Sequence, residues 1–122
     1  MSGNLGETVV EKAFFSKVNG VVFSWTRAGD CYMKIGAPSS GPGWSWERAK
    51  LKDVELGEIV AVVDGRSPEL KIYHSFGDSV TKGGVVRYDD KVTFRLGSLS
   101  KGLNLGEQIV LRQLILSMLP RM

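Results

Sequence analysis

The chain of 122 residues and 13.4 kDa has the length of one compact domain, so residues 1–122 are treated as a single unit. Apolar residues make up 43% and charged residues 24%, a globular composition that argues against a disordered chain. The formal net charge of +3 favours a polyanionic partner, and the single cysteine, Cys31, excludes an intrachain disulfide.

The amino-terminal third predicts a hairpin. Asn19-Gly20 lies between two apolar runs, roughly 13–18 and 21–27, and this dipeptide is the strongest short-range signal of a type I′ turn. A competing interpretation makes residues 7–18 a helix that ends at the same dipeptide, because its apolar residues share a helical face. We expect a helix that begins early and gives way to a strand near Phe15.

The middle of the chain is expected to be mostly β structure. Cys31, Met33 and Ile35 alternate with Tyr32 and Lys34, which is typical of a half-buried strand. A loop is expected over 37–43, a strand or short helix over 44–52, a central strand over 58–63, a turn over 64–68, a strand over 69–76, a loop over 79–84 and a tight hairpin over 85–96 with Asp89-Asp90 at its tip.

The carboxyl-terminal segment has the periodicity of a helix over about 104–119. Asn104 is a candidate N-cap with Glu107 at capping-box spacing, and Pro120 ends the segment. Its apolar residues cover nearly the whole circumference, so one face requires a second partner, most simply the same helix of another subunit. The alternative is that the amino-terminal segment packs over it. The expected oligomer contacts are Ile109, Leu111, Leu114, Ile115 and Met118.

No residue pattern predicts catalysis, a metal or a cofactor, so we expect a protein that is not an enzyme. His74 and Cys31 are too few for a structural zinc site, and neither has a partner at catalytic spacing. The glycine-rich segment 36–43 lacks the Gly-Lys-Ser/Thr ending of a phosphate-binding loop. The amino terminus does not resemble a signal peptide, and the apolar stretch 109–119 is too short to cross a bilayer, so a cytoplasmic location is expected.

The remaining signal is a set of aromatic and basic residues. Alternation groups Val21, Phe23, Trp25 and Arg27 on one face, and it pairs Tyr32 with Lys34 on the next strand. The 85–96 hairpin is expected to place Arg87, Lys91 and Arg95 on one face, opposite an apolar face. Rings beside cations suit single-stranded nucleic acid, because bases stack on aromatic faces while cations neutralise phosphates.

The layout also resembles a known family. The stretches VVFSWTR, GWSWERAK, VVRYDDKVTFRLG and GEQIVLRQLILSML, within about residues 14–119, resemble the ThermoDBP family of archaeal single-stranded DNA-binding proteins, including the ThermoDBP-related proteins. The small number of Asn and Gln residues is typical of thermophile proteins. A second likeness is to the transcription-coactivator and Whirly type of single-strand binder. The first likeness implies a fold other than the OB-fold, a groove lined by aromatic residues, oligomers built through the C-terminal helix and no catalytic residues. The second implies a curved sheet with a dimerising C-terminal helix, and both imply a single-stranded nucleic acid as ligand.

We therefore predict an α+β fold with a twisted antiparallel sheet packed on a carboxyl-terminal helix that also forms a homodimer or tetramer. The predicted function is binding of single-stranded DNA or RNA with little sequence dependence. The alternative is a small oligomeric adaptor with buried aromatics and a protein partner. The predicted binding residues are Phe23, Trp25, Arg27, Tyr32, Lys34, Trp44, Trp46, Arg48, Lys50, Arg87, Lys91 and Arg95.

Overall fold

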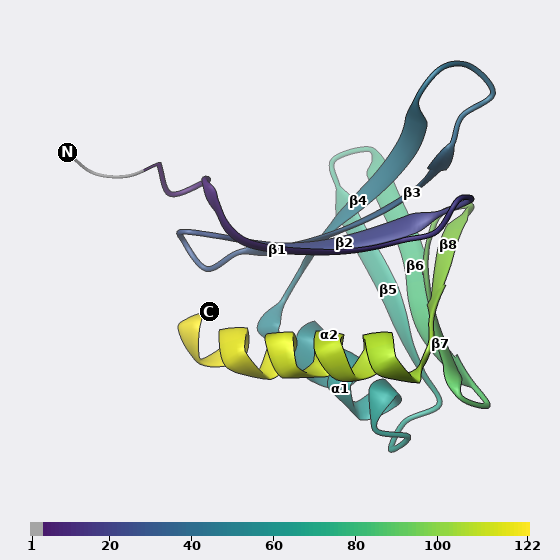
Figure 1. The fold of residues 1–122 in the computed structure, drawn as a ribbon. Helices are drawn as coiled ribbons and strands as arrows, with labels where there is room; N and C mark the ends of the chain where they lie inside the picture. The colour runs from purple at the N-terminus through teal and green to yellow at the C-terminus, as the bar shows by residue number, and fades with distance from the viewer. Residues whose placement is uncertain (1–3) are drawn as a thin grey trace.

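The computed structural model describes residues 4–122, apart from the side chain of Phe76, and within them two four-stranded antiparallel sheets enclose a core with two helices (Figure 1). Sheet A is a meander of β1 (Thr8–Phe15), β2 (Gly20–Thr26), β3 (Cys31–Pro38) and β4 (Trp44–Leu51). Sheet B is a second meander of β5 (Glu69–Phe76), β6 (Ser79–Tyr88), β7 (Lys91–Leu96) and β8 (Leu99–Leu103). The α+β prediction is confirmed, with two sheets in place of one.

The helices lie on one side of sheet A. The first, α1 (Asp53–Val63), connects the two sheets, and the second, α2 (Leu105–Met118), follows β8 and leads into a short 3-10 turn at Leu119–Arg121. Figure 1 shows both helices below sheet A, with the strands of sheet B running crosswise to β1 and β2. The β3–β4 hairpin projects beyond the rest of the chain. Within residues 4–122, neither helix has the length and apolar character needed to span a bilayer.

The core lies between the inner faces of the sheets and the helices. Alternating residues of β2 and β3 point into it, and so do those of β7, which is the pattern of strands with one buried face. The rings of Phe23 and Phe94 meet edge to face with centroids 5.5 Å apart and join the two sheets. Full burial of one such ring contributes about 1.5–3 kcal/mol.

Residues 58–63 form the second half of α1, so the expected central strand is wrong. Leu56, Ile59, Val60 and Val63 recur at helical spacing and are buried against the core. The backbone N–H of Lys52 donates to the Glu55 carboxylate at 2.8 Å and supports the first turn. A continuous apolar run cannot be assigned to strand or helix from its periodicity alone, which explains the error.

Three further expectations at the local level are corrected. Residues 8–15 form strand β1 along their whole length, paired with β2 from Thr8↔Thr26 to Phe15↔Gly20, and no helix precedes Phe15 within the described residues. The hairpin is confirmed, but its turn spans residues 16–19, and neither Asn19 nor Gly20 has the positive φ of a type I′ turn. Residues 79–84 belong to β6 because their backbone pairs with β5, and Gly83 and Gly84 pair with β7 as well.

The carboxyl-terminal helix begins as predicted. The Asn104 side chain accepts from the Glu107 N–H at 2.9 Å, and the Glu107 carboxylate accepts from the Asn104 N–H at 3.0 Å. Leu111, Ile115 and Met118 are buried on one face. Pro120 lies in the 3-10 turn that follows the helix. The predicted hairpin at Asp89-Asp90 is also confirmed, with Asp89 in the left-handed conformation at φ 54°.

Candidate nucleic-acid interface

The outer face of sheet A, which points away from the helices, collects six of the predicted binding residues. Strands β3 and β4 pair with register Tyr32↔Lys50, Lys34↔Arg48, Gly36↔Trp46 and Pro38↔Trp44. Directly paired residues of antiparallel strands project from the same face. The six residues on this outer face are Tyr32, Lys34, Trp44, Trp46, Arg48 and Lys50.

An aromatic cluster occupies the β3–β4 end of this face. The indoles of Trp44 and Trp46 are stacked, with centroids 5.8 Å apart and planes inclined by 25°. The ring of Phe15 contacts both indoles edge-on, at 5.8 and 6.1 Å. Trp46 is 41% exposed and Phe15 55% exposed, so these rings are open to a ligand.

Glycines make room for these rings. A Cβ at Gly36 would lie 2.5 Å from the Trp46 indole, and a Cβ at Gly20 would overlap the ring of Phe15. The backbone of each glycine is thus the surface on which an aromatic ring lies. Phe15 was not among the predicted residues, because its place on this face depends on the Phe15↔Gly20 and Gly20↔Gly36 pairings.

Cations lie directly over the rings of the same face. The Arg48 guanidinium is 4.7 Å from the centroid of Tyr32, and the Lys34 ammonium is 5.2 Å from that of Trp46. Lys50 forms an exposed ion pair with Asp30 at 3.3 Å. The two cation–π pairs hold positive charge at the ring faces, and each contributes about 0.5–1 kcal/mol at exposed sites.

Beside these pairs the face is hollowed. A polar hollow of about 260 Å³ lies there, and its lining includes Tyr32, two cations, Lys34 and Arg48, and two carboxylates, Glu11 and Asp30. The hydroxyl groups of the lining can donate hydrogen bonds. The charges of the lining are balanced, so the positive charge of this face is that of the cations over the rings and not of the hollow.

Phe23 and Trp25 do not belong to this face. Both are fully buried in the core, and no hydrogen-bond partner for the Trp25 indole N–H lies among the described residues. Strand β2 pairs Ser24 with Tyr32, so the even-numbered residues of β2 share the outer face and the odd-numbered ones point inward. The prediction correctly put Phe23 and Trp25 on one face of β2, and that face is the inner one.

Arg27 and Arg87 are also misplaced by the prediction. Arg27 follows the end of β2 and pairs with Glu7 at 2.9 Å. Arg87 donates to the Val63 carbonyl at 2.9 Å and to Gln108 Oε1 at 3.3 Å, on the inner side of sheet B. Arg87 pairs with Val92 across the two-residue turn, so odd-numbered residues of β6 share a face with even-numbered residues of β7. Arg87 therefore points away from Lys91 and Arg95.

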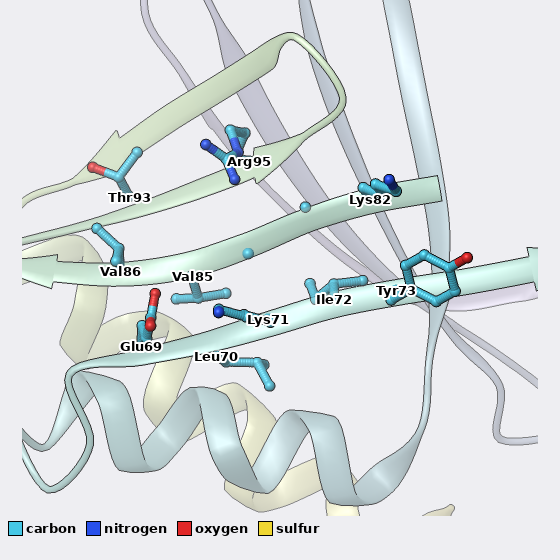
Figure 2. Close-up of a pocket in the computed structure, with 12 residues that line it drawn as sticks. Glu69, Leu70, Lys71, Ile72, Tyr73, Lys82, Val85, Val86, Thr93 and Arg95 are labelled. Carbon is cyan, nitrogen blue, oxygen red and sulfur yellow. The ribbon is translucent and has the colours of Figure 1, made fainter. Parts of the chain in front are cut away.

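Lys91 and Arg95 lie on the outer face of sheet B, apart from the aromatic cluster. Figure 2 shows Arg95 with Lys71, Tyr73 and Lys82, three residues that were not predicted. Tyr73 and Lys82 are direct cross-strand partners, with the ammonium 5.8 Å from the ring centroid. Lys82 was not predicted because residues 79–84 were expected to be a loop, and a loop residue cannot be assigned to a face of a sheet.

The expected oligomer contacts divide into two groups. Leu111, Ile115 and Met118 are buried in the chain's own core, which corrects their assignment to an interface between subunits. Ile109 is 62% exposed, and Leu114 is half-buried against the core. The apolar residues that α2 leaves exposed are Leu105, Ile109, Val110 and Leu116.

The two residues with reactive side chains are held in structural roles. His74 Nε2 lies 2.8 Å from Glu55 Oε2, which links β5 to α1. Burial raises the pKa of the Cys31 thiol to about 12, so the reactive thiolate is disfavoured. Within the described part of the chain, no three His, Cys, Asp or Glu side chains are grouped so that they could hold a metal ion.

Comparison with known proteins identifies the fold only. No family model and no curated protein matches the sequence. Among solved structures, the chain is similar to one in the crystal structures of MRP1/MRP2 from Trypanosoma brucei, with a TM-score of 0.68 and 12% sequence identity. The similarity covers 92% of this chain and 83% of that chain. The arrangement of two sheets and two helices is thus shared with the trypanosome structure.

Proposed function

We propose that the protein binds single-stranded DNA or RNA, with little dependence on sequence, on the outer face of sheet A. The observation that carries the proposal is the pair of rings with cations over them on this face: half-buried Tyr32 with Arg48, and exposed Trp46 with Lys34. Bases would stack on the indoles and the phenol, while Lys34, Arg48 and Lys50 would neutralise phosphates. The fold shared with the MRP1/MRP2 structures is compatible with this use of an open sheet face.

The geometry favours a single strand over a duplex. In a duplex the bases are stacked on one another, so their flat faces are not available to a protein ring. The rings of sheet A present faces and edges at the surface. Within residues 4–122, this face carries no helix that would enter a major groove. The proposal therefore requires unpaired bases.

The test is a titration of intrinsic tryptophan fluorescence with oligothymidine and oligouridine at several salt concentrations. Trp25 is buried, so Trp44 and Trp46 are the indoles that a ligand can quench. The substitution Trp25→Phe removes the buried background and should leave quenching intact. Trp46→Ala should weaken binding by about 1–3 kcal/mol, the value of one base stack.

Salt dependence provides a second readout. Three phosphate contacts to a single strand predict a slope of log K against log salt of about −2, and each of Lys34→Ala and Arg48→Ala should reduce its magnitude by about 0.7. Absence of quenching by micromolar strand at low salt would contradict the proposal. That result would favour the alternative, a small oligomeric adaptor with a protein partner and no nucleic-acid ligand.

A further inference from the structure

The outer face of sheet B contains a second, larger hollow of about 440 Å³ (Figure 2). Its floor is the backbone of Gly83 and Gly84 in β6. The pairings Lys71↔Gly84 and Gly84↔Arg95 place one cation on each side of this floor. A Cβ at Gly83 would overlap the Arg95 carbonyl, and a Cβ at Gly84 would lie 2.9 Å from that of Leu70. Packing of the strands thus requires glycine here, and the result is an open floor between two cations.

Tyr73 and Lys82 stand at one end of the hollow. Tyr73 is 63% exposed, and Lys82 lies over its ring at 5.8 Å. This is the same combination of an exposed ring and a cation that sheet A presents at Trp46 with Lys34. Lys71, Lys82 and Arg95 face one carboxylate, Glu69, in the lining, so the hollow is predominantly positive. Its chemistry suits a phosphodiester chain with stacking bases.

A third hollow shares one lining residue with each of the other two. It has about 680 Å³ and lies where β4 passes into α1, and its lining includes Lys50, Lys52 and His74 together with the carboxylates of Asp30 and Asp53. It shares Asp30 with the hollow on sheet A and Tyr73 with the hollow on sheet B. Strands β4 and β5 are edge strands of their sheets, so a path along these shared residues passes around two sheet edges.

We propose that a single strand bound on sheet A continues around β4, past Lys50, into the hollow on sheet B. Tyr73 stacks one of its bases, and Lys71, Lys82 and Arg95 neutralise its phosphates. This inference rests on the proposed function and extends it to a longer site within one chain. The course turns from one sheet to another, which a flexible single strand can follow but a duplex with a persistence length of about 150 base pairs cannot.

The experiment compares oligothymidines of about 4 and about 16 nucleotides, the range of site sizes found for single modules. Binding is followed by the anisotropy of an end-labelled strand. The test variant is Tyr73→Ala with Lys82→Ala. The matched control is Tyr88→Ala with Arg66→Ala, which also removes one exposed phenol and one exposed cation but lies outside all three hollows.

The wild type and the control should bind the longer strand more tightly than the shorter one. The test variant should bind the shorter strand as the wild type does and lose roughly tenfold or more on the longer strand, the equivalent of one lost base stack. Equal affinity of test variant and wild type for the longer strand would overturn the inference while the proposed function stands. Failure of the wild type to bind either strand would overturn both.

Discussion

At the scale of single residues, glycines determine where aromatic rings lie on the outer face of sheet A. Trp46 lies flat across Gly36, and the space for it exists because Gly36 has no side chain. The same relation holds between Phe15 and Gly20. The sequence shows the glycines and the rings, but it does not show that they are cross-strand neighbours, since this depends on register. The positions of the exposed rings therefore follow from pairing rather than from residue type.

The substitution Gly36→Ala tests this relation. The added Cβ would meet the indole of Trp46, which must leave its place and lose its stacking with Trp44. We expect the near-ultraviolet circular dichroism of the tryptophans to change while the far-ultraviolet spectrum keeps its β signal. Gly41→Ala is the control, because a Cβ there meets nothing within 4 Å. A wild-type near-ultraviolet spectrum in Gly36→Ala would show that the indole is not held by the glycine.

Cys31 provides a residue-scale prediction about reactivity. Its side chain is fully buried and burial raises its thiol pKa to about 12, so the folded protein should react with a thiol reagent only after opening. Labelling at mildly alkaline pH should be slow in buffer and rapid in denaturant. Fast labelling of the folded protein would mean that the inner face of β3 is accessible to solvent.

At the scale of elements, capping and packing define the two helices differently. Asn104 and Glu107 predict the start of helix α2, and both hydrogen bonds of the predicted capping box are present. Helix α1 has no such side-chain N-cap, and its apolar run is as compatible with a strand as with a helix. It becomes a helix because one stripe of its residues packs on the core. Local signals therefore identified α2 and failed for α1.

The substitution Asn104→Ala should destabilise the protein by about 0.5–2 kcal/mol, because it leaves an amide at the start of α2 without its acceptor. Urea unfolding gives the change from the shift in midpoint at constant slope. Gln113→Ala, at an exposed position of the same helix, is the control and should change stability by less than about 0.5 kcal/mol. Equal midpoints for the two variants would show that the cap is not used in solution.

A second element-scale prediction concerns pH. Arg112 of α2 donates to Asp64, at the end of α1, at 2.7 Å, and this hydrogen bond lowers the pKa of Asp64 from its ordinary value of 3.8. A group whose pKa is lowered on folding stabilises the protein above its unfolded pKa, and this contribution is lost as pH falls through the folded pKa. Stability should therefore decrease below the ordinary pKa of Asp64.

The substitution Arg112→Gln should remove this contribution at neutral pH and leave a smaller loss of stability on acidification. Urea midpoints at about pH 7 and about pH 3 measure the difference. Arg66→Gln is the control, since Arg66 approaches Asp64 only at 3.6 Å and is more exposed. Parallel pH profiles for the wild type and Arg112→Gln would exclude the role of this ion pair.

At the scale of the whole molecule, the core of the chain buries much of the apolar surface of α2. Leu111, Ile115 and Met118 pack inside the subunit, so an apolar helix did not require a second subunit for those residues. Leu105, Ile109 and Leu116 recur at helical spacing on an exposed stripe, which keeps self-association as a prediction on a different face. Leu114 is not suited to a test of this stripe, because it packs against the core.

Ile109→Arg is the corresponding test. A cation in the exposed stripe should dissociate a dimer or tetramer built on α2 and leave the fold intact, because the side chain is 62% exposed. Light scattering after size exclusion gives the mass. Val18→Arg, at a 68% exposed position in the β1–β2 turn, is the control. A wild-type mass for Ile109→Arg would place any oligomer contact elsewhere.

The sequence by itself determined the α+β class, the β3 alternation, the Asp89-Asp90 hairpin and the capping box of α2, because each depends on residues close together in the chain. It also singled out a set of rings and cations, and six of those residues meet on sheet A. Only the tertiary structure decided which face of each strand is inner, that residues 58–63 are helical, and that Lys71, Tyr73 and Lys82 share the outer face of sheet B. The physical reason is that a strand has two faces of equal backbone geometry. The choice between them is made by the register with its neighbours and by what packs against each face, and both are contacts between residues distant in sequence.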